Sequence, residues 1–277
     1  MAVTEKGRGR EGAHGDHLRE ECGVFGIWGA PNAARLAYAG LYSLQHRGQE
    51  SAGIVATDGE EYRLHRGIGL VSDVFAAGSL DRLQGHIAIG HNRYSTTGGS
   101  HIQNAQPLVV NFREGKLAIG HNGNLVNALE LRREMEEQGS IFQTTSDTEV
   151  ILHLIARSKA TEIERMVAEA LGRCQGAYSL VLLAGDKLIG VRDPRGFRPL
   201  CLGRRGESHV LASETCALDI VGATFIREIE PGEMVILDKE GVRSIKILAP
   251  EPMRACVFEL IYFSRPDSVV FGLSVDS

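Results

Sequence analysis

The sequence predicts an α+β fold in which two β-sheets pack face to face and helices cover them on the outside. Short apolar runs between turn residues, which are typical of strands, dominate both ends of the chain. Segments with helical spacing of apolar residues lie between them. No low-complexity linker follows residue 21, so we expect a single domain over residues 22–248.

The composition is that of a soluble globular protein, with 43% hydrophobic and 23% charged residues. A formal net charge of -5 gives no electrostatic argument for binding nucleic acid or an anionic membrane. No apolar run is long enough to cross a membrane, and the first residues lack the apolar centre of a secretory signal. The five cysteines are odd in number and scattered, which disfavours a disulfide framework and predicts a cytoplasmic protein.

Residues 1–21 contain charge, glycine and histidine without apolar periodicity, so we expect a leader that does not pack and is removed. Cys22 then opens a short apolar run that is typical of a buried strand. A thiol has a pKa of about 8.5 and a free α-amine one of about 7.7–8.0. If the chain is cut before Cys22, its own amine can therefore act as the general base. The alternative is that Cys22 is a small buried hydrophobe, which is the commoner role of a free cysteine.

The first predicted helix has apolar residues at helical spacing from Ala33 to Leu44, with Asn32 as its N-cap. Gly48 follows its last turn, where a residue with left-handed backbone is expected. Strands are predicted over residues 51–56 and 61–65, and the Asp58-Gly59 pair marks the turn between them.

An internal echo follows, since residues 88–92 and 118–122 both read Ala-Ile-Gly-His-Asn. Each copy ends an apolar strand and is followed by polar residues. Chance similarity of two core strands is one account, and no fixed period supports a repeat fold. The other account is that neighbouring strands deliver polar groups to one pocket.

Three helices and two hairpins complete the prediction. Asn124 is expected to cap a helix that is closed by Gly139. Residues 146–149 have the S-x-x-E form of a capping box, which places Asp147 in a first helical turn, where its carboxylate is stabilised. The third helix and the hairpins are expected over residues 163–171, 178–191 and 234–247.

Five motifs occur in order along the chain: Cys22 to Gly26, Leu44 to Gly53, Gly90 to Thr96, His121 to Leu125 and Thr144 to Asp147. Together they resemble the glutaminase domain of class II glutamine amidotransferases. The resemblance implies the four-layer αββα sandwich of N-terminal-nucleophile hydrolases, with two mainly antiparallel sheets. The sequences of residues 44–49, 192–200 and 256–268 are similar to the corresponding segments of certain family members. Those members supply ammonia for 5-phosphoribosylamine synthesis from phosphoribosylpyrophosphate in purine biosynthesis.

The resemblance implies that Cys22 attacks the side-chain amide of glutamine, forms a γ-glutamyl thioester and releases ammonia. The Asn122 amide and the Gly123 backbone N–H would hold the developing oxyanion, for which one donor typically contributes roughly 2.7–4 kcal/mol. Arg93 would bind the α-carboxylate of glutamine, and Asp147 its α-ammonium group.

The resemblance also places Arg47 beside the nucleophile, where it would position the Cys22 backbone. Each of these residues has a structural alternative. Arg47 can satisfy carbonyls at a helix end, Arg93 can form a strand-end salt bridge, Asp147 can cap a helix, and Asn122 can be a turn residue before glycine. The joint occurrence of these residues with Cys22 favours the functional interpretation.

No cofactor is expected for the glutaminase domain itself. His46, His91 and His121 show no ligand-type spacing, so we interpret them as structural hydrogen-bonding residues. Cys256 matches a ligand of the 4Fe-4S cluster in some relatives, whereas others carry a cysteine there without a cluster. A cluster needs several thiolates, so this chain alone is not expected to hold one.

The family's phosphoribosyltransferase half, for which Mg²⁺ is expected, has no counterpart in this sequence. We therefore expect a fragment or a truncated product, in which residues 249–277 begin the connection to that half. Phosphoribosylpyrophosphate would be bound only through the missing domain, and the full-length protein is expected to be a homo-oligomer. The alternatives are another class II amidotransferase, an amidase acting on other amides, and a non-catalytic domain of the same fold.

Overall fold

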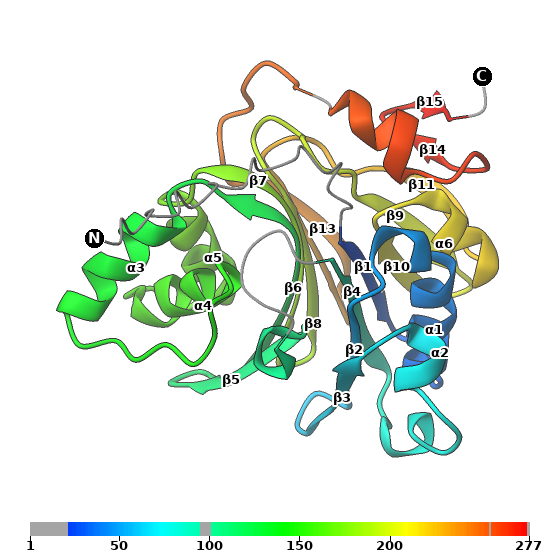
Figure 1. The fold of residues 1–277 in the computed structure, drawn as a ribbon, viewed down its shortest axis with the longest axis horizontal. Coiled ribbons are helices and arrows are strands. Elements are labelled where there is room, and N and C mark those ends of the chain that lie inside the picture. Colours follow the sequence, from blue (N-terminus) through cyan, green and yellow to red (C-terminus); the bar gives the residue numbers. More distant parts are fainter. Residues whose placement is uncertain (1–21, 95–100, 255, 276–277) are drawn as a thin grey trace, which may run out of the picture.

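The computed structural model describes residues 22–94, 101–254 and 256–275. The expected leader, residues 1–21, and residues 95–96 of the third motif lie outside the described residues. The chain folds into two stacked sheets with helices on both outer sides (Figure 1). This arrangement confirms the predicted α+β fold with four αββα layers.

The first sheet contains seven strands among the described residues, in the order β11-β9-β10-β1-β4-β2-β3. These strands are β1 (Gly23–Trp28), β2 (Ser51–Thr57), β3 (Tyr62–Ile68), β4 (Ile87–Arg93), β9 (Cys201–Arg205), β10 (Ser208–Ala212) and β11 (Thr224–Glu228). Every neighbouring pair is antiparallel. The strand that follows Cys22 therefore lies at the centre of its sheet, where it pairs on both sides.

The second sheet contains six strands among the described residues, in the order β13-β12-β8-β7-β6-β5, and is also antiparallel throughout. Its strands are β5 (Leu108–Phe112), β6 (Gly115–Leu125), β7 (Gly176–Ala184), β8 (Lys187–Arg192), β12 (Glu233–Asp238) and β13 (Gly241–Lys246). The predicted hairpins are thus confirmed as β7–β8 and β12–β13. A separate pair, β14 (Val269–Val270) with β15 (Leu273–Ser274), lies near the end of the chain.

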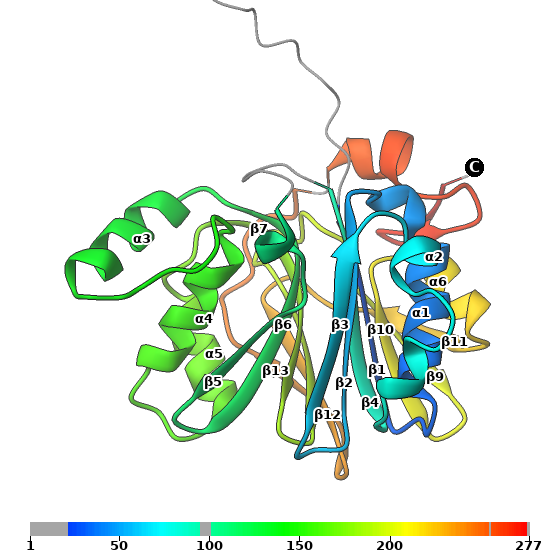
Figure 2. The ribbon, with the colours of Figure 1, turned by 60° about the horizontal axis from the view of Figure 1, so that its bottom comes forward.

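Helices cover the outer face of each sheet, as Figures 1 and 2 show. The first sheet is covered by α1 (Ala33–Ser43), α2 (Val71–Val74) and α6 (Thr215–Ile220). The second is covered by α3 (Ala128–Glu137), α4 (Thr148–Arg157) and α5 (Ile163–Leu171). Short helical turns occur at η1 (Gln45–Arg47), η2 (Leu80–Arg82), η3 (Ile102–Asn104) and η4 (Glu259–Phe263). No helix among the described residues is long and apolar enough to cross a membrane.

The central strands are buried on both faces, which explains why β1 reads as a continuous apolar run. Val24 packs between the two sheets, whereas Phe25 and Ile27 pack on the opposite face against α1. Gly40 lets α1 approach, because a Cβ there would lie 2.3 Å from the Phe25 ring. The helix covering thus holds β1, and with it the position of Cys22, in a close-packed layer.

Two expected helix boundaries are wrong. Gly48 has an extended backbone, with φ -165°, because η1 intervenes after α1. A Cβ at Gly48 would lie 2.7 Å from the carbonyl carbon of Arg93, so glycine is needed there for close approach. Asn124 is part of β6, and α3 begins only after Asn127, because the backbone of Asn124 pairs with β7.

The expected capping box at residues 146–149 is only partly present. The Ser146 hydroxyl accepts from the Thr148 N–H at 3.3 Å, but the structure places Asp147 at the N-cap of α4. The Glu149 carboxylate turns away from the cap to accept the backbone N–H groups of Gln143 and Thr144 at 2.8 and 2.7 Å. The glutamate therefore closes the preceding loop onto α4.

The internal echo lies in two different sheets. Its first copy belongs to β4 and its second to β6, and these strands face each other across the sandwich. The His91 ring nitrogen Nε2 lies 2.9 Å from the carbonyl oxygen of His121 and joins the two copies. The two strands are therefore neighbours across the sandwich rather than within one sheet, and their polar ends lie at the same end of it.

Candidate active site

Cys22 lies immediately before β1, and its thiol is partly exposed. The β1–β4 ladder begins at the next residue, where Gly23 pairs with Asn92. The Cys22 sulfur lies 3.6 Å from the carbonyl oxygen of Tyr94, just beyond the end of β4. A partly accessible thiol at the edge of a rigid central strand is suited to attack a ligand held beside it.

Arg47 joins the nucleophile residue to the domain core. Its guanidinium is fully buried, and Nε donates to the carbonyl oxygen of Cys22 at 3.1 Å. The expected contact between Arg47 and the Cys22 backbone is therefore present. Nη1 donates to Glu214 at 2.7 Å and Nη2 to Glu259 at 2.9 Å. Burial by itself lowers the pKa of Arg47, but Glu259 and Glu214 outweigh it and raise the pKa above its ordinary value.

Asn122 and Gly123 lie near the end of β6, in the facing sheet. Asn122 is fully buried, and neither its amide nitrogen nor its amide oxygen has a hydrogen-bond partner among the described residues. Leaving a buried polar group unpaired costs about 1–3 kcal/mol, so such a group in a native fold suggests a ligand-binding role. Gly123 has φ +149°, and a Cβ there would lie 2.0 Å from the Ala177 carbonyl oxygen. The backbone at this point therefore requires glycine.

Arg93 ends β4 on the same side as Cys22, because β1 and β4 run antiparallel. Its side chain is 5% exposed, and Nη1 donates to Glu50 at 2.8 Å. The structural alternative, a strand-end salt bridge, is therefore present. The pairing fixes the guanidinium in place, as recognition of a carboxylate with defined geometry requires.

Asp147 lies at the N-cap of α4, and its Oδ2 accepts from the backbone N–H of Leu125 at 2.9 Å. The carboxylate thus connects the helix to the end of β6. Burial by itself raises the pKa of Asp147, but His121 and the backbone N–H groups of Leu125 and Thr148 hold the pKa below its ordinary value. Asp147 is therefore an anion at neutral pH and is suited to pair with an ammonium group.

The histidines make structural contacts, as expected. The His46 ring lies 2.8 Å from Glu214, and the His121 Nδ1 lies 3.1 Å from the Thr148 hydroxyl. Burial lowers the pKa of His91 to about 3, so this ring is neutral. Within the described part of the chain, no group of three His, Cys, Asp or Glu side chains is arranged to hold a metal ion. The described residues give Cys256 no further ligands, and its role in a 4Fe-4S cluster of the full-length protein stays a prediction.

The structure gathers the predicted residues into two linked groups. Cys22, Arg47 and Arg93 lie at one end of the first sheet, whereas Asn122, Gly123 and Asp147 lie at the facing end of the second. Contacts of β6 with β1 and β4, and the hydrogen bond between the two echo copies, join the groups.

Sequence reasoning missed Glu214 and left Glu259 without a role, although both hold Arg47. The only local signal was that Glu259 belongs to a motif already noted over residues 256–268.

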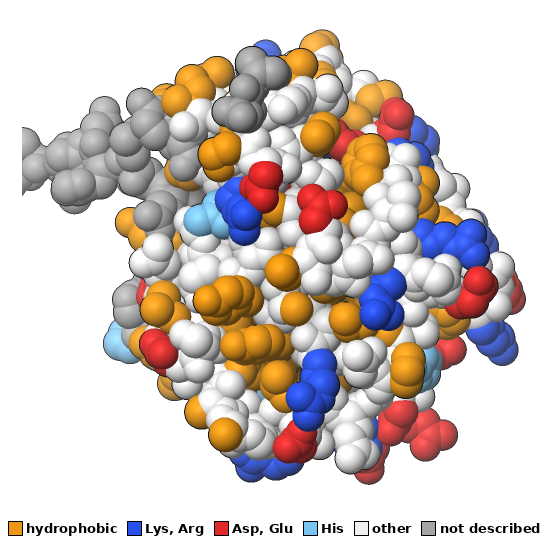
Figure 3. All heavy atoms as spheres, turned by 90° about the vertical axis from the view of Figure 1, so that its right-hand side faces the viewer, with side chains coloured by type: hydrophobic (Ala, Val, Ile, Leu, Met, Phe, Trp, Pro, Cys, Tyr) orange, Lys and Arg blue, Asp and Glu red, His pale blue; other side chains and the backbone are white. Residues whose placement is uncertain are grey.

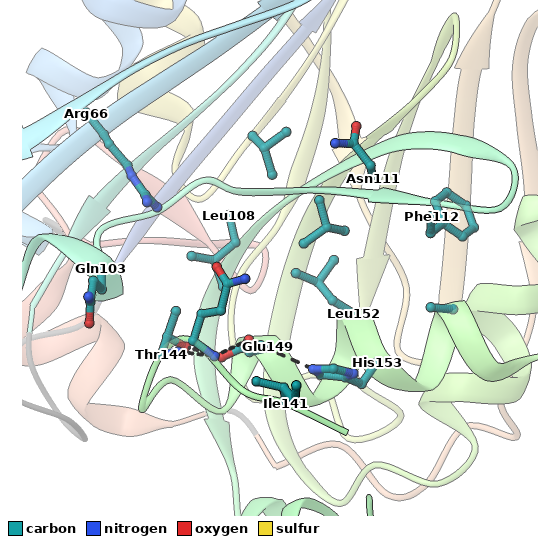
Figure 4. A pocket seen from close by; sticks show the side chains of 14 residues that line it. Arg66, Gln103, Leu108, Asn111, Phe112, Ile141, Thr144, Glu149, Leu152 and His153 are labelled. Carbon is teal, nitrogen blue, oxygen red and sulfur yellow. Dashed lines mark hydrogen bonds and ion pairs between the residues drawn. The ribbon is translucent and has the colours of Figure 1, made fainter. Parts of the chain in front are cut away.

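A pocket of about 480 Å³ lies between β5, α4 and the loop before α4 (Figure 4). Leu108, Phe112 and Leu152 form part of its apolar wall, and Glu149 and His153 lie on its α4 side. Cys22 and Asn122 do not line it. The pocket is thus separate from the candidate nucleophile.

Comparison with known proteins bears on the class of this domain. Residues 91–219 match the model of the glutamine amidotransferase domain family. Amidophosphoribosyltransferase of Bacillus subtilis (strain 168) is 51% identical over 261 residues, which are 94% of this chain and 55% of the relative. Chloroplastic amidophosphoribosyltransferase 2 of Arabidopsis thaliana is 54% identical, over 93% of this chain and 46% of the relative.

Among solved structures, the glutamine phosphoribosylpyrophosphate amidotransferase of B. subtilis, complexed with ADP and GMP, superposes with a TM-score of 0.89 at 50% identity. The match covers 92% of this chain and 56% of that one. The glutamine amidotransferase class II domain protein of Silicibacter pomeroyi superposes with a TM-score of 0.55 at 15% identity over 82% of this chain, and shows the fold alone.

Fold and site together define a class II glutamine amidotransferase domain with the N-terminal-nucleophile hydrolase architecture. The relatives that match this chain over 93–94% of its length are amidophosphoribosyltransferases. The chain spans about half the length of the curated relatives it matches.

Proposed function

We propose that this chain hydrolyses glutamine to glutamate and ammonia through a thioester on Cys22. The observation that carries the proposal is the fully buried amide of Asn122, whose two polar atoms lack partners among the described residues. Next to it, the Gly123 backbone N–H is held in a conformation that requires glycine. Two fixed donors beside a nucleophile are what acyl transfer requires.

In the first step the thiol proton of Cys22 passes to the α-amine that removal of residues 1–21 would create. The sulfur then bonds to the amide carbon, and the carbonyl electron pair moves onto oxygen, where Asn122 and Gly123 donate to it. When the intermediate collapses, the carbon–nitrogen bond breaks and the nitrogen leaves as ammonia with the proton from the amine. Water then adds to the thioester, the carbon–sulfur bond breaks, and glutamate is released.

Substrate selection follows from two charged side chains, Arg93 at the end of β4 and Asp147 at the N-cap of α4. A glutamine molecule has an α-carboxylate and an α-ammonium group at the end opposite its amide. We assign the carboxylate to Arg93, whose guanidinium is fixed by Glu50, and the ammonium group to the anionic Asp147. This charge pair favours glutamine over a neutral amide, which argues against a general amidase.

We further propose that the ammonia serves 5-phosphoribosylamine formation from phosphoribosylpyrophosphate, as the names of the relatives suggest. Residues 22–248 would be the glutaminase domain, and residues 249–277 would begin the connection to a transferase half. That half would bind the second substrate with Mg²⁺. The proposed cytoplasmic location rests on the odd number and the scattering of the five cysteines in the sequence.

The test supplies glutamine with and without phosphoribosylpyrophosphate and follows glutamate and pyrophosphate separately. The expected result is slow glutamate release that does not depend on phosphoribosylpyrophosphate, with no pyrophosphate. Cys22→Ala is the control and should release no glutamate. Absence of glutamate release by a folded chain that begins at Cys22 would favour a non-catalytic domain, and pyrophosphate release by this chain would contradict the assignment of that step to another half.

A further inference from the structure

The segment over residues 256–275, which we call the C-terminal segment, sends one charged side chain into the core. The segment comprises η4 and the β14–β15 pair and lies over α6 (Figure 1). The exposed hydrophobic side chains Phe258 and Ile261 flank Glu259, whereas Glu259 itself has no exposed surface. Figure 3 shows hydrophobic side chains scattered over the side of the molecule that carries this segment. Burying a carboxylate is unfavourable unless it is paired, so its partners indicate what it does.

Glu259 makes a two-pronged contact with Arg47. Its two carboxylate oxygens accept from Arg47 Nη2 at 3.0 and 2.9 Å, and Oε1 also accepts from Arg198 Nη1 at 3.1 Å. Glu214 holds the other terminal nitrogen of Arg47 at 2.7 Å. Because a guanidinium is planar and rigid, fixing both terminal nitrogens also fixes the direction of Nε. That nitrogen donates to the carbonyl oxygen of Cys22.

Glu214 ties the same segment to the same arginine from the other side. Its Oε2 accepts from the backbone N–H of Arg265 at 3.0 Å and from the hydroxyl of Ser268 at 2.8 Å. Each of the two carboxylates that hold Arg47 therefore depends on the C-terminal segment. The C-terminal segment supplies Glu259, and it orients Glu214 through the Arg265 backbone N–H and the Ser268 hydroxyl.

Cys22 is suited to be controlled in this way. It precedes the first residue pair of the β1–β4 ladder, so pairing of the sheet starts only after it. The hydrogen bond from Arg47 acts on its carbonyl group, one bond away from the carbon that bears the thiol side chain. A change in the direction of Arg47 would therefore move the sulfur relative to the Asn122 amide.

We infer that Glu259 is a positioning residue for the nucleophile, acting through Arg47 so that the seated C-terminal segment sets the orientation of Cys22. This inference rests on the proposed glutaminase function. It assigns Glu259 no contact with glutamine. Loss of Glu259 should thus affect the chemical step and leave the binding of glutamine, through Arg93 and Asp147, largely unchanged.

The test compares kcat and KM for glutamine in the wild-type chain, Glu259→Gln and Glu259→Asp, together with the melting temperature of each. Glu259→Gln keeps the shape but loses the charge, and should lower kcat about tenfold with KM within about threefold. Glu259→Asp keeps the charge but reaches less far, and should lower kcat about two- to fivefold. In an Arg47→Lys background, Glu259→Gln should add less than about twofold, because both substitutions break the same link.

Asp267→Asn is the matched control. Asp267 lies in the same segment and pairs with Arg265 at 2.6 Å, but at the surface, with 54% of its side chain exposed. This variant should keep the wild-type kcat. If Glu259→Gln does not fold, Glu259→Asp decides the question, since an unchanged kcat would overturn the inference.

A lowered melting temperature with wild-type kcat in Glu259→Gln would also overturn it, by showing a purely structural role. An additive effect in the Arg47→Lys background would overturn the claim that Glu259 acts through Arg47. If the wild-type chain itself releases no glutamate, the proposed function fails and the inference falls with it. An active wild type with equally active Glu259 variants contradicts the inference alone.

Discussion

Replacing Asn122 by leucine should separate catalysis from stability. Asn122 is fully buried and both polar atoms of its amide lack partners among the described residues. Burying an unpaired polar group costs about 1–3 kcal/mol, and leucine is of similar size and apolar. The unfolding free energy of the variant is therefore expected to equal that of the wild type or to exceed it by about 1–3 kcal/mol.

The same substitution removes an oxyanion donor, which typically contributes about 2.7–4 kcal/mol to the transition state. Activity should fall about 100- to 1000-fold in kcat with little change in KM, because the donor acts on charge that develops during the reaction. Asn122→Ala should show the same kinetic effect. The assays are steady-state glutamate release and denaturant unfolding of the same preparations.

Asn92, the residue at the same place in the other echo copy, provides the control. It is equally buried, but its amide donates to the Leu41 carbonyl oxygen at 2.8 Å. Asn92→Leu removes this hydrogen bond, although the Leu41 carbonyl oxygen still accepts from the Leu44 N–H at 3.0 Å, and should lose about 0.5–1.5 kcal/mol of unfolding free energy. The reasoning is refuted if Asn122→Leu is destabilised as much as Asn92→Leu, or if its only kinetic effect is a higher KM.

Three other substitutions test separate parts of the site. Arg93→Lys should raise KM for glutamine by about tenfold or more with little effect on kcat, because lysine cannot make a two-pronged carboxylate contact; an unchanged KM would remove Arg93 from the substrate site. Gly123→Ala should destabilise the fold by about 3 kcal/mol or more, since its Cβ would lie 2.0 Å from the Ala177 carbonyl oxygen, and wild-type unfolding would contradict this. Burial by itself raises the pKa of Glu214, but His46 and Arg47 outweigh this effect, and the net pKa falls from 4.5 to about 2. At about 1.36 kcal/mol per pH unit, this shift corresponds to about 3 kcal/mol of stability. That contribution is fully present above pH 4.5 and is lost as pH falls toward 2, so the unfolding free energies of wild type and Glu214→Gln should converge over that range; a gap that does not vary with pH would contradict the assignment.

Local periodicity was sufficient to predict most elements of the fold. The apolar spacing of α1 and α5 and the turn glycines of the β7–β8 and β12–β13 hairpins are properties of neighbouring residues, so the sequence reveals them directly. The assignment of the two echo copies to different sheets depends on pairing between distant strands, which no local pattern encodes. Gly48 was misjudged because glycine serves both left-handed turns and close approaches of two backbones.

The candidate site was predictable to a similar extent. Cys22, Asn122 and Asp147 belong to short motifs whose order along the chain carries the family resemblance. No local pattern identifies the partners of Arg47, because Glu214 and Glu259 lie 167 and 212 residues further along the chain. A buried arginine requires carboxylate partners, but its own surroundings in the sequence do not say which ones.

The most direct test of the central claim is acid quenching of the chain during turnover with glutamine, followed by mass spectrometry of the peptide that contains Cys22. We predict that the peptide begins at Cys22 and carries a γ-glutamyl group on its sulfur, and that Cys22→Ala neither forms this adduct nor releases glutamate. Full glutamate release by a chain that retains residues 1–21, or undiminished release by Cys22→Ala, would contradict the account.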